Sequence, residues 1–167
     1  MMKDTLQAII DSPSQATDIR ELEGLALAYA IAKYVKGWEL KILDPAFVAR
    51  PYWVCRDQGA KISVPMAEYR PDMNWMQCGE LKERFAVSDD IDPARADQVK
   101  HRALLDNLTR KDWGKDIQLR ISANGPTAQV AICRAILKSI TPADEDILIP
   151  KDLPELIGAL PVIEKQF

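Results

Sequence analysis

The pattern of apolar and polar positions predicts two well-defined helices. Between residues 19 and 33, apolar side chains recur at steps of three and four, which places them on one helical face. Thr17 or Asp18 fits the cap at the start of this helix, and Gly37 fits its end. A second strong helix is predicted over residues 130–138, where apolar residues again recur with helical spacing.

Residues 38–43 and 116–122 alternate apolar and polar side chains, as half-buried strands do. Residues 52–56, after Pro51, are a further strand candidate, and residues 60–68 are a weaker one limited by Pro65. Residues 69–77 are rich in turn formers and are predicted to be an ordered loop, with a helix after it over residues 79–87. Because strands and helices do not alternate regularly, we predict an α+β fold in which a small, mainly antiparallel sheet is covered by two or three helices.

The length of 167 residues favours a single domain that spans residues 1–167. Within it, residues 88–112 become strongly charged, and the part that follows Asp92-Pro93 carries a narrow apolar stripe. This segment fits an amphipathic helix or a mobile excursion from the main domain, and we predict a helical insertion over residues 88–112. Acidic residues and prolines beyond residue 141 predict a C-terminal tail, residues 142–167, that wraps the domain in short pieces.

Composition and charge narrow the functional classes. The net charge of -3 and the pI near 5.3 argue against a dedicated nucleic-acid-binding domain, which normally carries a basic face. The sequence shows no secretory signal and no apolar run of membrane-spanning length, which predicts a soluble, cytoplasmic protein without a membrane partner. The three cysteines form no CxxC pair and are expected to be reduced thiols, two or more of them packed in the core.

No residue set matches a nucleophile with its base, a metal site or a cofactor motif, so we predict no catalytic residue, no metal and no cofactor. His101 is expected to be a solvated histidine on an exposed helix. Asp89-Asp90 and residues 144–146 are acidic runs in segments expected to be solvated loops, and neither matches the spacing of a calcium loop.

Two glycine-containing turns that open helices are candidate ligand sites. Helix N-termini present unpaired N–H groups and a partial positive charge, which can seat an anion. If the fold brings both turns together, Arg70, Arg120 and Thr127 would converge on a phosphate or carboxylate, with Trp75 as a stacking wall. The candidate ligand-binding residues are Arg70, Asn74, Trp75, Gln77, Gly79, Arg120, Asn124, Gly125 and Thr127.

The same residues also fit purely structural roles. Trp75 fits a core anchor whose indole N–H donates to a backbone carbonyl. Asn74 and Asn124 fit turn formers, and Thr127 fits a helix cap. Both interpretations stay open on the sequence alone.

Four short blocks resemble those of a known family. The pattern Tyr69-x-Pro71-x-x-Asn74-Trp75-x-Gln77-x-Gly79, followed by Glu83-Arg84, resembles the Y-S-P-S-T-D-W-x-Q-G-G-P-x-x-E-R block of the phage NinX-like family of small proteins. Residues 125–134 resemble its G-P-T-P-L-I-A-A-M-R block, residues 22–33 its opening helix, and residues 149–153 its closing V-P-x-E-L. The blocks follow the family's order over about residues 20–153.

The chain departs from these blocks at several positions: Arg70 and Asp72 replace small hydroxyl residues, Asn74 an aspartate, Cys78 a glycine and Glu80 a proline. The resemblance implies a phage or prophage accessory protein in the cytoplasm of a bacterial host. It implies no reaction, because the family offers no established activity to transfer to a residue of this chain.

The leading hypothesis is a non-enzymatic accessory protein that forms a homodimer and binds a host or phage macromolecule. The alternative is a small-molecule binder that holds a nucleotide or another phosphorylated ligand at the two helix N-termini. A third and weaker interpretation is a hydrolase with Asp72 or Glu80 as its base.

Overall fold

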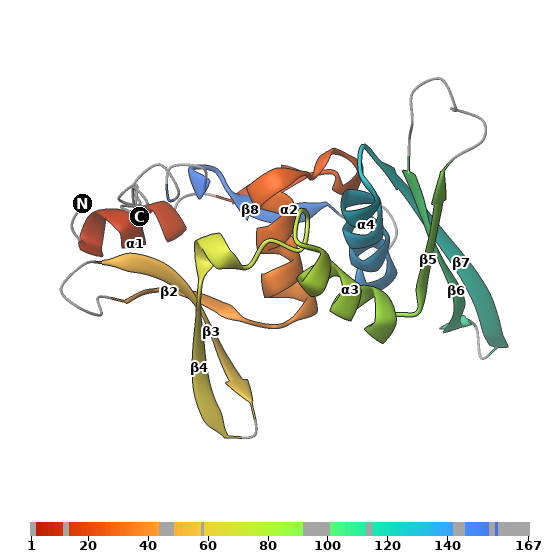
Figure 1. Cartoon of the computed structure of the whole chain (residues 1–167), viewed down its shortest axis with the longest axis horizontal. Coiled ribbons are helices and arrows are strands. Elements are labelled where there is room, and N and C mark those ends of the chain that lie inside the picture. Colours follow the sequence, from red (N-terminus) through yellow and green to blue (C-terminus); the bar gives the residue numbers. More distant parts are fainter. Residues whose placement is uncertain are drawn as a thin grey trace.

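The computed structural model describes residues 3–11, 14–43, 49–57, 59–91, 101–112, 115–141, 146–153 and 156. The helices are α1 (Lys3–Ile10), α2 (Gly24–Ala30), α3 (Trp75–Arg84) and α4 (Ala128–Ile140) (Figure 1). Shorter helical turns are the 3₁₀ turns η1 (Ile19–Glu21) and η4 (Met66–Glu68) and the π turn η2 (Ile31–Val35). The strands are β1 (Ser14–Thr17), β2 (Glu39–Leu43), β3 (Arg50–Asp57), β4 (Ala60–Pro65), β5 (Val87–Ile91), β6 (His101–Asp112), β7 (Lys115–Gly125) and β8 (Ile147–Pro150).

Within the described residues, all strand pairs are antiparallel and form three sheets, ordered β1–β8, β2–β3–β4 and β5–β6–β7. The predicted α+β fold with antiparallel pairing is therefore confirmed, although the strands are divided among small sheets. Figure 1 shows α2, α3 and α4 between the β2–β3–β4 sheet and the β5–β6–β7 sheet. One hydrophobic core joins residues from both sheets, from β8 and from all four helices.

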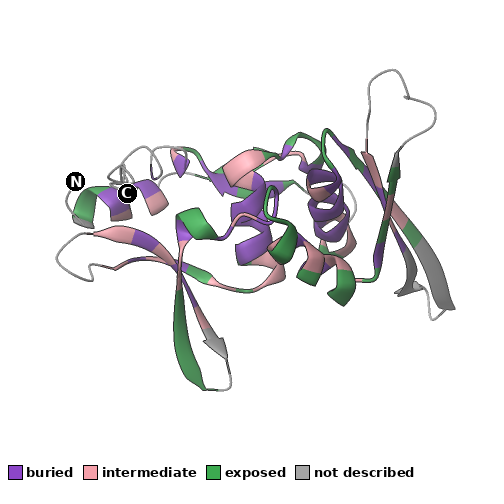
Figure 2. Cartoon of the chain, in the orientation of Figure 1, coloured by how far each residue is buried: buried purple, intermediate pink, exposed green. Residues whose placement is uncertain are grey.

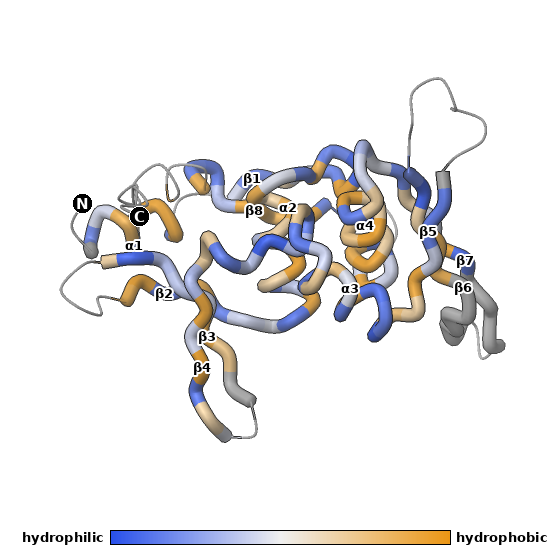
Figure 3. Tube along the Cα trace, in the orientation of Figure 1, coloured by the Kyte–Doolittle hydropathy of each residue, from blue (hydrophilic) through white to orange (hydrophobic). Residues whose placement is uncertain are grey.

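Helix α4 forms the centre of this core. It packs against β5, β6 and β7 on one side and against α2, η2 and α3 on others. Figure 2 shows its buried surface, and Figure 3 shows that most of its length is hydrophobic. A helix that is apolar all round is stable only when it is enclosed, which explains its central place. Its buried residues are Ala128, Val130, Ala131, Ile132, Cys133, Arg134, Ala135, Ile136 and Leu137.

The helix predicted over residues 19–33 is divided into separate pieces. Asp18 caps the short η1 turn by accepting a hydrogen bond from the Arg20 N–H, and the chain then extends before α2 begins at Gly24. Gly24 has a φ of +60°, a conformation that glycine adopts without strain, so it starts the helix instead of interrupting it. Gly37, with a φ of +70°, follows the helical segment as predicted.

Buried Arg134 holds this divided segment in place. Its Nε donates to the carbonyl oxygen of Leu22 at 2.8 Å, and its Nη1 donates to the carbonyl oxygen of Asn124 at 2.9 Å. Burial lowers the pKa of Arg134, and nearby Glu23 opposes that shift. One side chain of α4 thereby ties the chain before α2 to the end of β7.

The predicted helical insertion over residues 88–112 is wrong for its described parts. Residues 87–91 form β5 and residues 101–112 form β6, while residues 92–100 lie outside the described part of the chain. Ala103 and Leu105, two positions apart, point into the core as alternate residues of a strand do. Strand β6 pairs with β7 from His101–Gly125 to Asp112–Lys115, so tertiary pairing decides the structure of this segment.

The described part of the predicted C-terminal tail packs on the domain. Strand β8 pairs with β1, and its side chains alternate, with Ile147 and Ile149 buried and Leu148 exposed. The Tyr34 hydroxyl donates to the carbonyl oxygen of Leu148 at 2.8 Å. Residues 142–145, 154–155 and 157–167 lie outside the described residues. None of the helices in the described ranges combines the length and the apolar character needed to span a membrane.

Candidate binding surface

The loop between η4 and α3 is braced by its own polar groups. The backbone N–H groups of Met73 and Asn74 both donate to the carbonyl oxygen of Arg70. The Gln77 amide reaches back from the first turn of α3, where its oxygen accepts from the Arg70 N–H at 2.6 Å and its nitrogen donates to the Glu68 carbonyl at 2.7 Å. These bonds fix the path of the chain into α3.

Arg70 is neutralised within the same loop. Its Nε and Nη2 atoms each lie 2.9 Å from an oxygen of Asp72, and Asp72 is buried. This bidentate pair raises the pKa of Arg70 through its hydrogen bond to Asp72. Because its guanidinium is engaged by a neighbouring carboxylate, Arg70 contributes to the shape of the loop.

Asn74 is the N-cap of α3. Its Oδ1 accepts from the N–H groups of Met76 and Gln77, which satisfies two of the unpaired donors at the helix start. The helix begins at Trp75, four residues before the predicted start, so Gly79 lies inside the helix and not at its N-terminus. The predicted turn-forming role of Asn74 corresponds to this cap.

The second group of candidate residues, Asn124, Gly125 and Thr127, lies where β7 ends and α4 begins. Thr127 caps this helix, as its Oγ1 accepts from the Val130 N–H at 3.2 Å. Gly125 ends β7, and a Cβ built on it would lie 2.8 Å from the Ala131 nitrogen. The carbonyl of Asn124 is engaged by Arg134. Each of the three residues thus has a structural role: Thr127 caps the helix, Gly125 allows close packing, and Asn124 accepts a hydrogen bond from Arg134.

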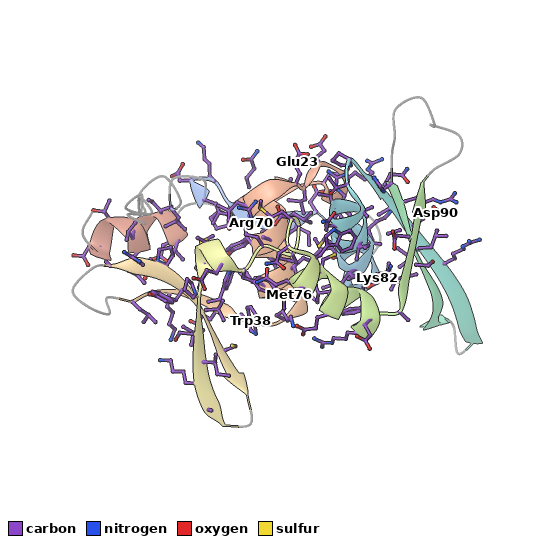
Figure 4. All side chains as sticks on the ribbon, viewed as in Figure 1. Glu23, Trp38, Arg70, Met76, Lys82 and Asp90 are labelled. Carbon is purple, nitrogen blue, oxygen red and sulfur yellow. The ribbon has the colours of Figure 1, made fainter. Side chains whose placement is uncertain are left out.

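The structure does not bring Arg70 and Arg120 together. Arg120 is an exposed residue of β7 whose charge acts on Asp90 of β5. In Figure 4, Asp90 lies at the outer sheet beyond α4, whereas Arg70 lies near the middle of the molecule. The convergence of Arg70, Arg120 and Thr127 on one anion therefore has no geometric support.

Three apolar side chains stand in solvent where the braced loop enters α3. Met73 is 64% exposed, Trp75 53% and Met76 87%. We call them the Met73–Trp75–Met76 patch. Trp75 is therefore not the core anchor that the structural interpretation expected. Met73 and Met76 were not among the predicted site residues, and their positions gave no signal of exposure, because an apolar residue just before a helix cap often packs against the first turns of the helix.

Half-buried Trp38 and an ion pair adjoin this region. The ring centroids of Trp38 and buried Tyr69 are 4.7 Å apart. Lys36 Nζ lies 5.5 Å from the Trp38 ring centroid and 2.7 Å from Glu80 Oε1, one turn beyond Met76 along α3. Figure 4 labels Trp38 and Met76 close to this end of α3.

Two buried thiols lie where α3 packs on α4. Cys78 and Cys133 are both fully buried and free, which confirms the prediction that at least two cysteines pack in the core. A hydrogen bond with Cys78 and burial raise the pKa of Cys133. Cys133 is therefore protonated at neutral pH and acts as a small core side chain.

The remaining titratable candidates have local partners. His101 begins β6 opposite Ile91 and Gly125 and is half-buried, so its predicted place on an exposed helix is wrong. Asp89 pairs with Lys82 and Asp90 with Arg102, and both acids lie in β5 and not in a loop. Over the described ranges, no three His, Cys, Asp or Glu side chains are grouped so that they could hold a metal ion.

A scan against protein-family models found no family that matches this chain, and a search of the curated proteins found no relative. The resemblance to the phage NinX-like family stays a prediction.

Proposed function

We propose that this chain is a binding protein, an accessory protein of the phage type, and that it contacts a partner protein through the Met73–Trp75–Met76 patch. The observation that carries the proposal is the exposure of these three apolar side chains on a loop fixed by internal hydrogen bonds. The phage setting and the bacterial cytoplasm come from the family resemblance alone and belong to the proposal.

The residue types of the patch suit an interface. Tryptophan and methionine are enriched in protein–protein contacts, and buried tryptophan is among the residues that contribute most to binding free energy. Methionine side chains adapt to irregular apolar surfaces. The patch combines both types within four consecutive residues.

The loop beneath the patch lowers the entropic cost of binding. Asn74, Gln77 and the Arg70–Asp72 pair already hold the backbone in place. A partner therefore has to order only the exposed side chains, at about 0.5–1.5 kcal/mol for each flexible one.

The contacts of the candidate residues do not favour the alternative, a site for a small phosphorylated molecule. Its central residues already have structural partners: Arg70 pairs with Asp72, Asn74 and Thr127 cap helices, and Gly125 is closely packed. These contacts leave no observation that favours a phosphorylated ligand.

The test is quantitative affinity capture from an extract of the cells that make the protein. The wild type is compared with a Trp75→Ala, Met76→Ala double variant and with Leu148→Ala, a matched control that removes an exposed apolar side chain elsewhere, on β8. We expect at least one protein to be retained by the wild type and the control and reduced about tenfold or more with the patch variant. Equal retention of every protein by all three would refute the proposal.

A further inference from the structure

Resting on the proposed function, we infer the chemistry of the partner: the Met73–Trp75–Met76 patch accepts an amphipathic helix of another protein that carries apolar side chains beside lysine or arginine. The inference follows from the charges that surround the patch and from the helical geometry of α3.

The exposed side of α3 has an apolar end and an acidic end. Met76, Glu80 and Glu83 follow one another at steps of four and three and so share one helical face, which Met73 extends before the cap. Met76, Glu80 and Glu83 are all exposed. Residues at this spacing form a ridge on the helix surface, and a second helix packs by setting such a ridge into its own groove.

A further acid lies at the apolar end. Glu68 is exposed, and Gln77 ties its backbone to the first turn of α3. Within the described residues, neither Glu68 nor Glu83 has an ion-pair partner. Glu68 on one side and Glu83 on the other therefore flank the patch with carboxylates that form no ion pair with a cation of the described ranges.

Three cations among the described residues lie near this surface. Lys36 pairs with Glu80 and is largely buried, and Lys82 pairs with Asp89 of β5. Arg84 lies over the Phe85 ring, 5.4 Å from its centroid. Stacking on Phe85 leaves the charge of Arg84 in place, so the carboxylates of Glu68, Glu80 and Glu83 exceed the cations Lys36 and Arg84 by one. This excess of negative charge attracts a basic partner and repels an acidic one.

The same carboxylates disfavour three other possible occupants of the patch: a second copy of the chain, a nucleic acid and an anionic lipid surface. A twofold dimer through this patch would set this acidic surface against its own copy, because a twofold interface uses one surface twice. Phosphates of nucleic acids and anionic lipid headgroups would meet the same repulsion. A basic, apolar protein helix is the occupant that satisfies both the methionines and the carboxylates.

The test uses two fluorescent peptides of about 18 residues, long enough to present several helical turns. One has leucine on one helical face and lysine on the other, and the second has glutamate in place of lysine. Anisotropy titrations measure the dissociation constant of each peptide for the wild-type chain. We expect the lysine peptide to bind about tenfold or more tightly than the glutamate peptide, and the difference to shrink as salt is raised.

Variants of the chain show how much of the peptide binding comes from apolar contact and how much from charge. Met76→Asp is expected to raise the dissociation constant for the lysine peptide about tenfold, while Leu148→Ala leaves this constant unchanged. A Glu68→Lys, Glu83→Lys variant is expected to reverse the preference toward the glutamate peptide. The milder Glu68→Gln, Glu83→Gln variant is expected to abolish the preference, and it keeps the measurement possible if the reversal harms folding.

The outcomes distinguish this inference from the proposed function. Equal binding of both peptides, lost in Met76→Asp, would overturn the basic partner but leave the patch as a binding surface. Failure of both peptides to bind would overturn the inference, and the capture experiment would then decide the proposed function by itself. The wild type could also sediment as a dimer, and the Met76→Asp variant as a monomer. That result would identify a second copy of the chain as the occupant of the patch and overturn the inference.

Discussion

At the scale of single residues, Gly125 lies where β7 ends against the first turn of α4. A Cβ at this position would lie 2.8 Å from the Ala131 nitrogen and 3.2 Å from the Val130 carbonyl carbon. Both are backbone atoms of a buried helix, so neither can move aside as a flexible side chain would. The glycine is required here by close packing and not by the ligand contact that its place in a turn suggested.

We therefore predict that Gly125→Ala lowers the free energy of unfolding by about 1–3 kcal/mol, as added atoms do in a filled core. The control is Gly79→Ala, inside α3, where nothing lies within 4 Å of the added Cβ. That change is expected to stabilise the chain by up to about 1 kcal/mol, because alanine favours helix more than glycine does. Urea unfolding measures both. Equal effects of the two substitutions would contradict the packing argument.

Asp18 provides a prediction of pH dependence. Its carboxylate accepts from the Arg20 side chain and the Arg20 N–H, which lowers the pKa of Asp18 from 3.8 to about 2. A lowered pKa in the folded state means that the ionised group stabilises the fold above pH 3.8 and that this stabilisation disappears as the pH falls toward 2. Because the ion pair is exposed, salt should weaken the effect.

The matched variant is Asp18→Asn, which keeps an oxygen to cap η1 but removes the charge. Its Tm is expected to lie below that of the wild type at pH 7, with the gap closing as the pH approaches 2. Thermal unfolding followed by circular dichroism at a series of pH values gives the gap. A gap that persists unchanged at pH 2 would mean that cap geometry, and not ionisation, sets the difference.

At the scale of elements, local patterns predicted much of the structure. The alternation over residues 38–43 and 116–122 corresponds to strands β2 and β7, and the strand candidate over residues 52–56 corresponds to β3. In β2 the pattern follows burial, because Leu40 and Ile42 face the core. The glycine-containing turn before α4 was also recognised, since a threonine cap and a run of apolar residues are both local signals. These features depend on neighbours along the chain.

Features that depend on distant partners were missed. Ala103, Leu104 and Leu108 fit a helical stripe, but pairing with β5 and β7 makes residues 101–112 a strand. The exposure of Trp75 depends on how the braced loop lies against the rest of the molecule, which its spacing does not reveal. The hypothesis that Arg70 and Arg120 converge likewise required knowledge of where β7, which carries Arg120, lies relative to the loop of Arg70.

The starts of α3 and α4 give a test that separates cap from surface. Thr127→Ala removes the oxygen that accepts from the Val130 N–H and is expected to lower the free energy of unfolding by about 1 kcal/mol. Trp75→Ala removes an exposed side chain and is expected to change it by no more than about 0.5 kcal/mol. Urea titrations of both variants supply the values. A loss of several kcal/mol for Trp75→Ala would mean that Trp75 is a core residue, which would remove the central member of the patch.

At the scale of the whole molecule, segments far apart in sequence close the fold around α4. Strand β8 pairs with β1 across almost the full length of the chain, and the Tyr34 hydroxyl bonds the β8 backbone from η2. Leu153 and Leu156, beyond β8, are also fully buried. The end of the described chain is therefore part of the core that holds the earlier elements together.

This closure predicts opposite results for neighbouring positions of β8. Ile149 is 6% exposed and faces the core, so Ile149→Ala is expected to lower the free energy of unfolding by about 2–4 kcal/mol through lost burial and the cavity left behind. Leu148 is 51% exposed, and Leu148→Ala is expected to stay within about 0.5 kcal/mol, since Tyr34 bonds only its backbone carbonyl. Urea unfolding at one fixed pH compares them. If both changes were harmless, β8 would be a loosely attached tail, and the core would have to be complete without it.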